Sequence, residues 1–445
     1  KFSYKDFGDF GDFVKKVQIE SSMHNVFVDS KDIEYFAPDM KFVKFKAKVN
    51  QGEVKGTVAN MSVKDADIQT GEETRLVGDF SIKGLPDINK TIFDFQADQL
   101  RTSASDVEKL VPELSNQSSF ALPEQLHRLG LINFAGSFKG LYNLFDVEGT
   151  FNTELGKIET NSKIDIQKNI QYAGNMKSEE FQIGNLINSN TIKNSAFNLE
   201  FDGQNLDFKE IQLNIIGDLR RFQLNNYQYD SVSVDAFLFE EQIEMNGHIS
   251  DPNIALAYDS KINLSGEFNI YNVDAQIDQI NLKKLGLVNK DSIIIYDSNI
   301  STHLTGNNLN NLNGDLRANQ ISMQTSKGKF SIDDVFFAAE GNETDRLLTL
   351  KSNVMDGEMK GVIDLNTLVP YFKALAMKYA PAIGLETESY NPQIFDLELN
   401  IKSFEPVSAF LDPTLTLEDG ATLEAHFNSE DFTAQFNAFS PFVKY

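Results

Sequence analysis

The sequence of 445 residues contains no cysteine, which argues against a secreted eukaryotic protein, since such proteins of this length usually carry disulfides. No apolar run approaches the roughly 20 residues that a membrane-spanning helix needs. The longest runs, such as Val335–Ala339, have the size of a strand. The chain begins at Lys1 and has no basic segment followed by an apolar one, the pattern of a signal peptide. We therefore expect any membrane anchor to lie outside this sequence.

Positive charge is also scarce: 40 lysines and arginines stand against 65 aspartates and glutamates, for a formal net charge of −25. Without a basic stripe to neutralise phosphates, we expect no nucleic-acid partner. For the same reason we do not expect electrostatic adsorption to an anionic membrane surface. Acidic and basic residues are interspersed and 41% of the residues are hydrophobic, which favours an ordered protein over an acidic tail.

Motifs of catalysis are missing. The five histidines are far apart in the chain, so they do not have the spacing of metal ligands. The sequence has no nucleophile elbow, no P-loop and no dinucleotide fingerprint. Most carboxylates occupy the polar positions of alternating segments, which is typical of a solvated face. We expect a protein that is not an enzyme, with no catalytic site, no cofactor and no metal.

Alternation of apolar and polar residues dominates the sequence. Phe197, Leu199 and Phe201 are apolar, whereas Asn198 and Glu200 between them are polar. A period of two predicts strands with one apolar and one wet face, as in antiparallel sheets. The same period occurs at 43–49, 145–151, 211–215, 232–238, 359–365, 395–401 and 423–427. Predicted turns between strands are Asp202-Gly203, Asp251-Pro252-Asn253, Asn313-Gly314, Asp356-Gly357 and Asp419-Gly420.

Two segments interrupt the β pattern. Ser105–Glu108 has the form of a capping box that opens a short helix, which we expect Pro112 to end, and a second short helix is predicted at Gln125–Leu129. Leu368–Ala380 has helical spacing, and we favour a helix that caps the sheet over one that binds a partner. The predicted organisation is a β-groove segment at 1–104, a helical insertion at 105–129, a β-groove segment at 130–366, a short helix at 367–382 and a β-groove segment at 383–445.

A loose motif, Gly-x-Phe within a strand, recurs at Gly78, Gly136, Gly149 and Gly266. A single glycine in a strand marks a bulge or bend. The recurrence of the set indicates a repetitive, curved sheet.

The stretch from Ser105 to Leu285 carries a series of short motifs in a set order. They are Leu122-Pro123, Leu129-Gly130, Gly136-x-Phe138-x-Gly140, Leu144-Phe145, Gly149-x-Phe151, Leu155-Gly156-Lys157-Ile158, Tyr172-x-Gly174, Phe181-x-Ile183-Gly184-x-Leu186-Ile187, Leu206-Asp207, Asn226-Tyr227-x-Tyr229, Asn246-Gly247, Asp251-Pro252-Asn253 and Leu264-x-Gly266. In this order the stretch resembles the TamB/AsmA-like family (translocation and assembly module), in the form found in Bacteroidetes-type bacteria.

The resemblance implies an all-β fold in which a long antiparallel sheet curls into an open, taco-like groove lined by apolar side chains. It implies a location in the periplasm of a Gram-negative bacterium and transport of phospholipid between the inner and outer membranes. It also implies support of outer-membrane protein assembly with a TamA-like barrel protein. The sequence has no recognisable domain for binding such a barrel.

Physical reasoning supports a groove independently. A sheet with one apolar face must cover that face, and few helices are predicted to do so. Moving a two-chain lipid through water exposes about 30 methylenes at about 0.8 kcal/mol each. A continuous apolar path removes most of that barrier. We expect phospholipid acyl chains to contact Val43, Phe45, Ala47, Phe138, Val147, Phe151, Phe197, Leu199, Phe201, Leu213, Val234, Leu238, Leu264, Met359, Ile363, Phe395, Leu397 and Leu399.

Two other interpretations stay open. One is a structural or adhesive surface protein, such as a filament or a β-sandwich array. Such an array would show repeats of about 100 residues each, and none is visible. A scaffold that templates other β proteins through its strand edges is compatible with a groove.

Overall fold

A computed structural model describes residues 1–445 except 37–43, 116–117, 289–291, 412–415, 442 and 445. The chain divides into two compact units, unit 1 (Lys1–Glu240) and unit 2 (Glu241–Tyr445). Strands dominate both units, as the alternating pattern predicts. The predicted fold class, an all-β antiparallel sheet that curls without closing into a barrel and carries few short helices, is confirmed.

The strands of unit 1 are β1 (Phe2–Ser3), β2 (Gln18–Asp29), β3 (Lys46–Thr57), β4 (Asn60–Thr70), β5 (Thr74–Lys83), β6 (Ile92–Ser103), β7 (Leu131–Leu141), β8 (Leu144–Thr153), β9 (Gly156–Asp165), β10 (Gln171–Phe181), β11 (Ser195–Gln204), β12 (Gln212–Leu224) and β13 (Tyr227–Phe239). Its helices are η1 (Phe7–Asp12), α1 (Phe13–Lys16), α2 (Ser30–Phe36), η3 (Ile88–Lys90), α3 (Ala104–Ser115), α4 (Glu124–His127) and α5 (Ile183–Ile187).

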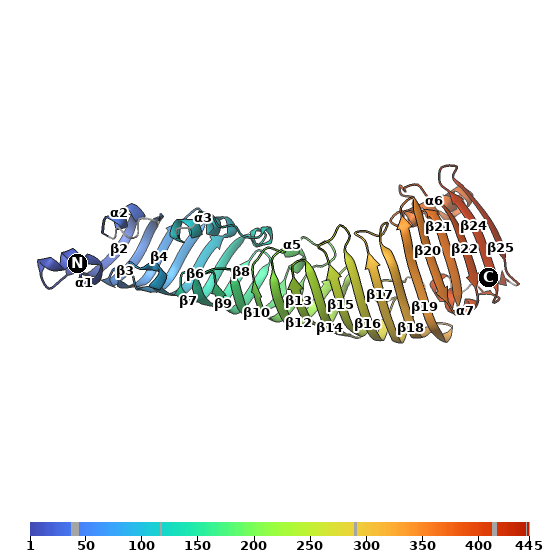
Figure 1. Cartoon of the computed structure of the whole chain (residues 1–445), viewed down its shortest axis with the longest axis horizontal. Coiled ribbons are helices and arrows are strands. Elements are labelled where there is room, and N and C mark those ends of the chain that lie inside the picture. Colours follow the sequence, from blue (N-terminus) through green and yellow to red (C-terminus); the bar gives the residue numbers. More distant parts are fainter. Residues whose placement is uncertain (37–43, 116–117, 289–291, 412–415, 442, 445) are drawn as a thin grey trace. The chain divides into compact units, whose positions relative to one another are not determined.

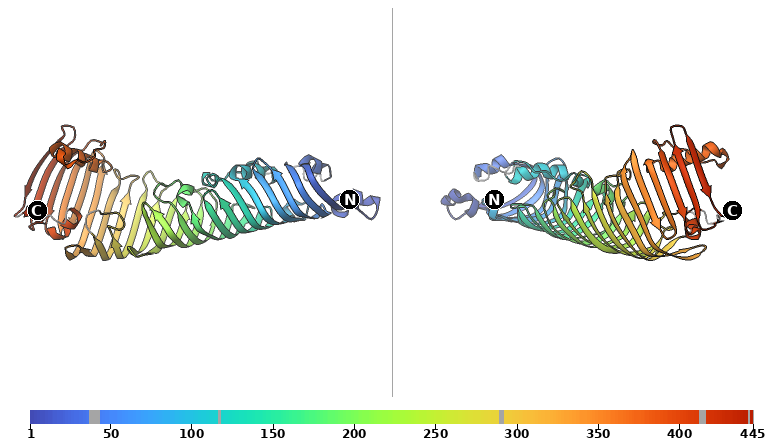
Figure 2. Two further views of the ribbon diagram at one scale, coloured as in Figure 1. Left: turned by 180° about the vertical axis from the view of Figure 1, so that it is seen from behind. Right: turned by 45° about the vertical axis from the view of Figure 1, so that its right-hand side comes forward.

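Each strand of unit 1 pairs antiparallel with the strands before and after it in the chain. Among the described strands no pairing joins β1 to β13, so this sheet remains open. The views of Figure 2 show the strands lying side by side, with helices only at strand ends. Because every connection is local, the sheet is a meander.

The strands of unit 2 are β14 (Gln242–Asp251), β15 (Ile254–Asn263), β16 (Ile270–Asn281), β17 (Ile294–Thr305), β18 (Asn313–Thr325), β19 (Gly328–Asn342), β20 (Asp345–Ser352), β21 (Met355–Val362), β22 (Ile394–Ile401), β24 (Ala421–Asn428) and β25 (Thr433–Phe439), with a separate pair β23 (Thr416–Leu417) and β26 (Val443–Lys444). Its helices are α6 (Leu368–Tyr379), η4 (Pro381–Ile383) and α7 (Phe404–Leu411). From β14 to β25 the strands again form an antiparallel meander.

Helices line the edges formed by strand ends. In unit 1, α2, α3 and α5 follow β2, β6 and β10, so a meander brings all three to the same edge (Figure 1). In unit 2, α6 and α7 follow the adjacent strands β21 and β22 and therefore lie at opposite edges. Helices α3, α4 and α6 were predicted, whereas α1, α2, α5 and α7 were not.

Three of the five predicted turns are wrong. Asp202-Gly203, Asn313-Gly314 and Asp356-Gly357 lie within β11, β18 and β21 and pair with neighbouring strands. Asp251-Pro252-Asn253 and Asp419-Gly420 do connect strands. The three glycines lie on the apolar face, where they replace a side chain rather than reverse the chain.

The predicted start and end of the first long helix are also wrong. Helix α3 begins at Ala104, and the N–H of Asp106 donates to the Ser103 hydroxyl (3.3 Å), so Ser103 caps the helix instead of Ser105. Pro112 lies inside α3, which continues to Ser115.

Candidate functional site

The apolar sides of the strands in unit 1 join into one surface, called the inner face below. One row of directly opposite residues crosses eight adjacent strands without a polar member, and directly opposite residues share a face. From β2 to β9 the row consists of Val26, Val49, Ile68, Leu76, Leu100, Phe134, Phe151 and Ile158. Only Phe151 of this row was among the residues predicted to line a groove. Val49, Ile68, Leu100 and Ile158 each stand between two polar residues, and this alternation was the signal that could have identified them.

A second row lies beside the first and is aromatic in its centre. Phe80, Phe95, Phe138 and Val147 lie opposite one another on β5 to β8. The ring centroids of Phe80 and Phe95 are 5.3 Å apart, and those of Phe95 and Phe138 are 5.8 Å apart. Such contacts add to the energy of area burial, so they stabilise the register of these strands.

The inner face continues to the last strand of unit 1. Met176 on β10 lies opposite Leu199 on β11, which lies opposite Gly217 on β12 and, through it, Val234 on β13. Ten of the residues predicted to line a groove therefore share this face: Ala47, Phe138, Val147, Phe151, Phe197, Leu199, Phe201, Leu213, Val234 and Leu238. Phe45 immediately precedes β3 and is partly buried. Val43 lies outside the described residues.

The two faces differ sharply in charge. From β3 to β13, every paired position of the inner face holds an uncharged residue in the described strands. Strand β11 shows the contrast: the Phe197 side chain is 3% exposed, Leu199 and Phe201 are partly exposed, and Asn198 and Glu200 are exposed. A ligand that follows the inner face thus meets no ionised group at these positions.

Glycines on the inner face let the strands bend. Gly136 (φ +152°) and Gly149 (φ +159°) lie opposite each other on β7 and β8. A Cβ at Gly149 would meet the carbonyl oxygen of Ala135 at 2.3 Å, so no other residue fits without a shift. The Phe134 ring covers both glycines, within 2.9 Å of either added Cβ. The Gly-x-Phe motif of the sequence therefore marks a bend of the strand at Gly136 and Gly149. Gly266 instead lies in the loop after β15.

Along one edge of unit 1, loops and short helices pack onto the ends of the inner face. Phe181 and Phe197 form a buried cluster with Leu155. Ile183 and Leu186 of α5 pack against this cluster. These segments cover strand ends and leave the middle of the inner face partly exposed.

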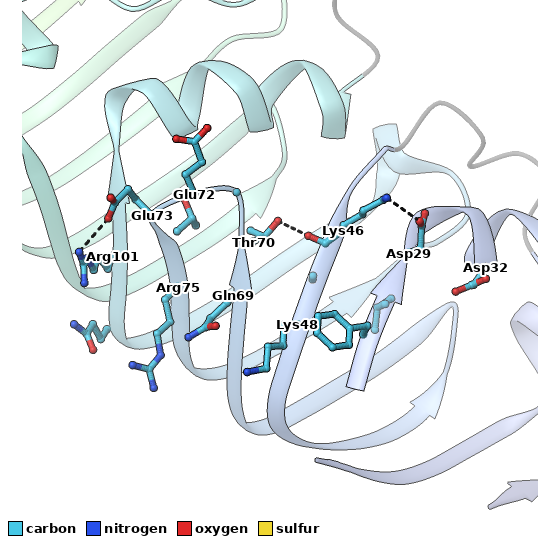
Figure 3. A pocket seen from close by; sticks show the side chains of 16 residues that line it. Asp29, Asp32, Lys46, Lys48, Gln69, Thr70, Glu72, Glu73, Arg75 and Arg101 are labelled. Atoms are coloured by element: carbon cyan, nitrogen blue, oxygen red, sulfur yellow. Dashed lines mark hydrogen bonds and ion pairs between the residues drawn. The ribbon is translucent and has the colours of Figure 1, made fainter. Parts of the chain in front are cut away.

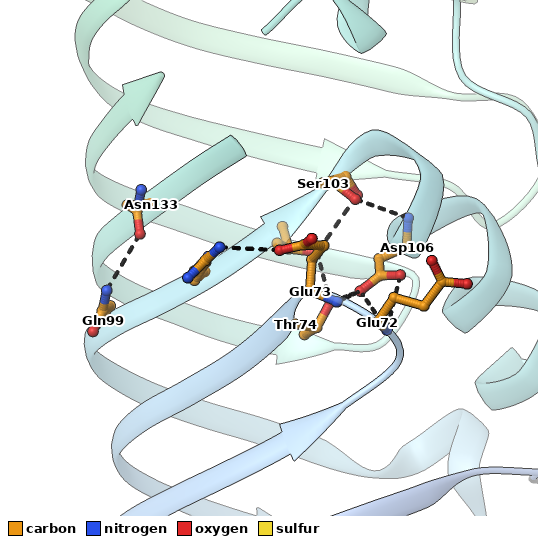
Figure 4. Close-up of polar contacts among 9 residues, drawn as sticks. Glu72, Glu73, Thr74, Gln99, Ser103, Asp106 and Asn133 are labelled. Atoms are coloured by element: carbon orange, nitrogen blue, oxygen red, sulfur yellow. Dashed lines mark hydrogen bonds and ion pairs between the residues drawn. The ribbon is translucent and has the colours of Figure 1, made fainter. Parts of the chain in front are cut away.

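A buried carboxylate fixes α3 to this edge. Asp106, 1% exposed, accepts hydrogen bonds from the N–H groups of Glu72 (3.1 Å) and Glu73 (2.7 Å) and from the Thr74 hydroxyl (2.9 Å), as Figure 4 shows. Burial alone would raise the pKa of Asp106, but these donors outweigh it and hold the pKa below its usual value. The interaction joins the start of α3 to the turn between β4 and β5.

A hollow of about 900 Å³ opens beside this turn, across the ends of β2 to β6 (Figure 3). Lys48, Gln69 and Arg75 extend into it from neighbouring strands on the polar side of the sheet. Arg75 makes a two-pronged ion pair with Asp67, with both distances 2.8 Å, and this pairing lowers the pKa of Asp67. The cations of the hollow are balanced by Asp29, Asp32, Glu72 and Glu73 in its wall, so its charge favours no particular ligand.

In unit 2 the apolar face is partly covered. Met359, Phe395 and Leu397 share one side of β21 and β22. Tyr371 and Leu375 of α6 pack onto this side with Phe395, which is 1% exposed. Here α6 closes part of the apolar face into a core.

The remaining predicted residues of unit 2 lie in different surroundings. Leu399 shares the apolar side with Leu397. Ile363 follows β21 and is fully buried in the cluster beneath α6. Leu264 lies in the loop after β15, where its N–H donates to the Glu241 carbonyl (2.9 Å). Leu264 was predicted to line a groove, and it lies outside the described strands.

One cation lies on the apolar side of unit 2. Arg346, 1% exposed, lies between Gly341 and Gly361 on the adjacent strands. Its guanidinium donates to the carbonyls of Gly341 (3.3 Å) and Leu312, and burial lowers its pKa. Backbone carbonyls thus solvate this charge.

The described residues contain no group of three or more histidine, aspartate or glutamate side chains that could hold a metal ion. No helix in the described part of the chain has the length and apolarity to cross a bilayer. None of the protein-family models, curated proteins or solved structures compared with the chain matches it. The interpretation of the inner face therefore rests on its own geometry.

Proposed function

We propose that this chain is a non-catalytic, lipid-conducting groove protein of the TamB/AsmA type. Phospholipid acyl chains move along the inner face between the inner and outer membranes of a Gram-negative bacterium. The protein acts in the periplasm and in outer-membrane biogenesis, where it also supports protein translocation and assembly with a TamA-like barrel partner. The observation that carries the proposal is the unbroken, uncharged inner face of unit 1.

The chemistry of that face suits acyl chains. A row from Val26 to Ile158 offers apolar contact on eight successive strands. Each methylene kept out of water contributes about 0.8 kcal/mol. Small residues such as Gly217 between Leu199 and Val234 leave room above the sheet. The headgroup would remain in water, because the paired positions of the inner face from β3 to β13 offer it no charged partner.

The sandwich alternative receives less support. A β-sandwich places two sheets face to face over a closed core. In the described part of unit 1, every strand belongs to one meander, and no second sheet faces its apolar side. A scaffold that templates other β proteins stays compatible with a groove.

Two adjacent isoleucines test the proposal with the same substitution on opposite faces. Ile215 on β12 lies opposite Phe201 on the inner face, whereas Ile216 lies opposite Glu200 and is 56% exposed. We expect lipid extraction and native mass spectrometry of the purified chain to detect bound phospholipid. Ile215→Glu should reduce the bound lipid severalfold, because a charge on that face meets acyl chains. Ile216→Glu should leave the amount unchanged.

Thermal melts of both variants accompany the lipid measurement. Absence of phospholipid from the unmodified protein, or equal lipid in two folded variants, would contradict the proposal. If Ile215→Glu unfolds the chain, the closed-core alternative is favoured instead.

A further inference from the structure

Residues 1–16 carry a group of exposed aromatic side chains, called the aromatic cluster below. Phe2 is 56% exposed, Tyr4 44%, Phe7 82% and Phe10 40%. The rings contact mainly one another: the Tyr4 and Phe10 centroids are 4.8 Å apart, and those of Phe7 and Phe10 are 5.6 Å apart. Exposed apolar patches of this kind mark interaction sites.

The charges around the aromatic cluster are not those of the whole chain. Residues 1–16 contain four lysines and three aspartates, against a net charge of −25 for the protein. Two of the aspartates serve the segment itself. Asp6 accepts from the Gly8 N–H (2.8 Å), and Asp9, 8% exposed, accepts from the Lys5 N–H (2.8 Å) and lies 3.9 Å from the Lys16 ammonium. Lys5, Lys15 and Lys16 are exposed in the same segment of the chain.

From this combination we infer that the aromatic cluster docks on the surface of an anionic lipid bilayer. Aromatic rings with one side apolar prefer the membrane–water interface, and neighbouring lysines attract anionic headgroups. Phe7 and Phe10 enter the headgroup region while the lysines contact phosphates. At physiological salt the acidic body of the protein beyond about 8 Å is largely screened from this contact. The inference is independent of the groove, since it concerns a different surface and a bilayer rather than a single lipid.

The absence of tryptophan makes a clean reporter possible. Phe7→Trp places a single indole in the aromatic cluster. Phe27→Trp is the matched control, because Phe27 is 78% exposed on the polar side of β2. On addition of phosphatidylglycerol–phosphatidylcholine vesicles to the full chain, we expect the emission of Phe7→Trp to shift to the blue and that of Phe27→Trp to stay unchanged. Pure phosphatidylcholine vesicles should bind more weakly.

Vesicle sedimentation of two further variants separates the contributions. Phe7→Ser combined with Phe10→Ser should lower vesicle binding by about tenfold per ring, whereas Phe27→Ser should not change it. Lys15→Gln combined with Lys16→Gln should weaken binding only to anionic vesicles. The proposal would be overturned by equal shifts of both tryptophans or by no shift of either. It would also be overturned by a shift that appears without vesicles as the protein concentration rises, because a second copy of the chain would then cover the aromatic cluster. Lipid found in the groove would not rescue it.

Discussion

Units 1 and 2 are built from the same alternating strands, yet they use their apolar sides differently. In unit 1 the inner face is uncharged at its paired positions from β3 to β13, and the helices α2, α3 and α5 cover strand ends along one edge. In unit 2 the helices α6 and α7 lie at opposite edges, and each packs apolar residues onto the sheet. An alternating strand therefore does not determine whether its apolar side becomes a binding surface or a core, because the helices decide this.

The net charge also differs between unit 1 and unit 2. Unit 1 has 26 basic and 36 acidic residues, a net charge of −10, whereas the shorter unit 2 has 14 and 29, a net charge of −15. Unit 2 also carries the buried Arg346 on its apolar side. If lipid moves along these faces, the described strands of unit 1 offer the less obstructed part.

The largest difference between the units should appear when a ring is removed from the core beneath α6. Phe395→Ala should lower the free energy of unfolding by about 3–5 kcal/mol, because it leaves a cavity among Tyr371, Phe372 and Phe427. Leu199→Ala in unit 1 should lower the free energy of unfolding by distinctly less, since Leu199 is already partly exposed. Chemical denaturation monitored by circular dichroism measures both. Equal costs would remove the distinction between a closed core and an open face.

A second comparison concerns how the edge helices are held. Asp106→Asn should lower the free energy of local unfolding of α3 by about 2–3 kcal/mol, because an amide cannot accept all the hydrogen bonds of the buried carboxylate. Asp364→Asn, just before α6, should have a smaller effect on that helix, because α6 is also held by its apolar cluster. Hydrogen exchange measured helix by helix tests both substitutions.

Because Asp106 holds α3, we expect the stability of α3 to depend on pH. The pKa of Asp106 in the folded protein lies below its ordinary value of 3.8, so its stabilisation is fully present above that value and disappears as the pH falls through the folded pKa. Exchange protection of α3 should therefore fall at acid pH in the unmodified protein. In Asp106→Asn it should not change over that range. A pH-independent α3 in the unmodified protein would show that another contact holds the helix.

The strands could be predicted far better than the segments between them. The alternation at Phe197, Leu199 and Phe201 identified β11 and its apolar side, because a period of two has a direct physical meaning. The pair Asp202-Gly203 looked like a turn and lies in a strand, since a glycine can serve a bend of the apolar face as well as a chain reversal. Local sequence does not distinguish these two uses.

The contacts at the edge of the sheet could not be predicted from the sequence. The sequence pattern predicted a capping box that begins at Ser105, whereas the structure places the cap at Ser103. The hydrogen bonds from Glu72 and Glu73 to Asp106 join residues far apart in the chain, and no local pattern announces them. Helix α5 is a single short turn-like segment, Ile183–Ile187, with too few residues to show a helical period. The division after Glu240 is accompanied by no linker-like composition.

A charge on the inner face should impair function more than stability. Leu199→Glu should cost about 1–2 kcal/mol in unfolding, because the carboxylate can reach water from a partly exposed position. Envelope permeability in cells should nevertheless rise, since the inserted charge interrupts the apolar line between Met176 and Gly217. A folded Leu199→Glu protein with full activity would falsify conduction at this strand. Gross unfolding would instead indicate that the apolar side of β11 belongs to a closed core, as the apolar side of β22 does in unit 2.

The smallest effect should come from the adjacent residue. Glu200 is exposed on the polar side of β11, opposite Ile216 on β12. Glu200→Leu should change the free energy of unfolding by no more than about 0.5 kcal/mol, as is usual for surface positions. Envelope permeability should match that of the unmodified protein. Because the two substitutions are one residue apart and both exchange a charge with an apolar group, their comparison separates the faces of one strand. If Glu200→Leu impaired the envelope as strongly as Leu199→Glu, the functional surface would have to include the polar side of the sheet.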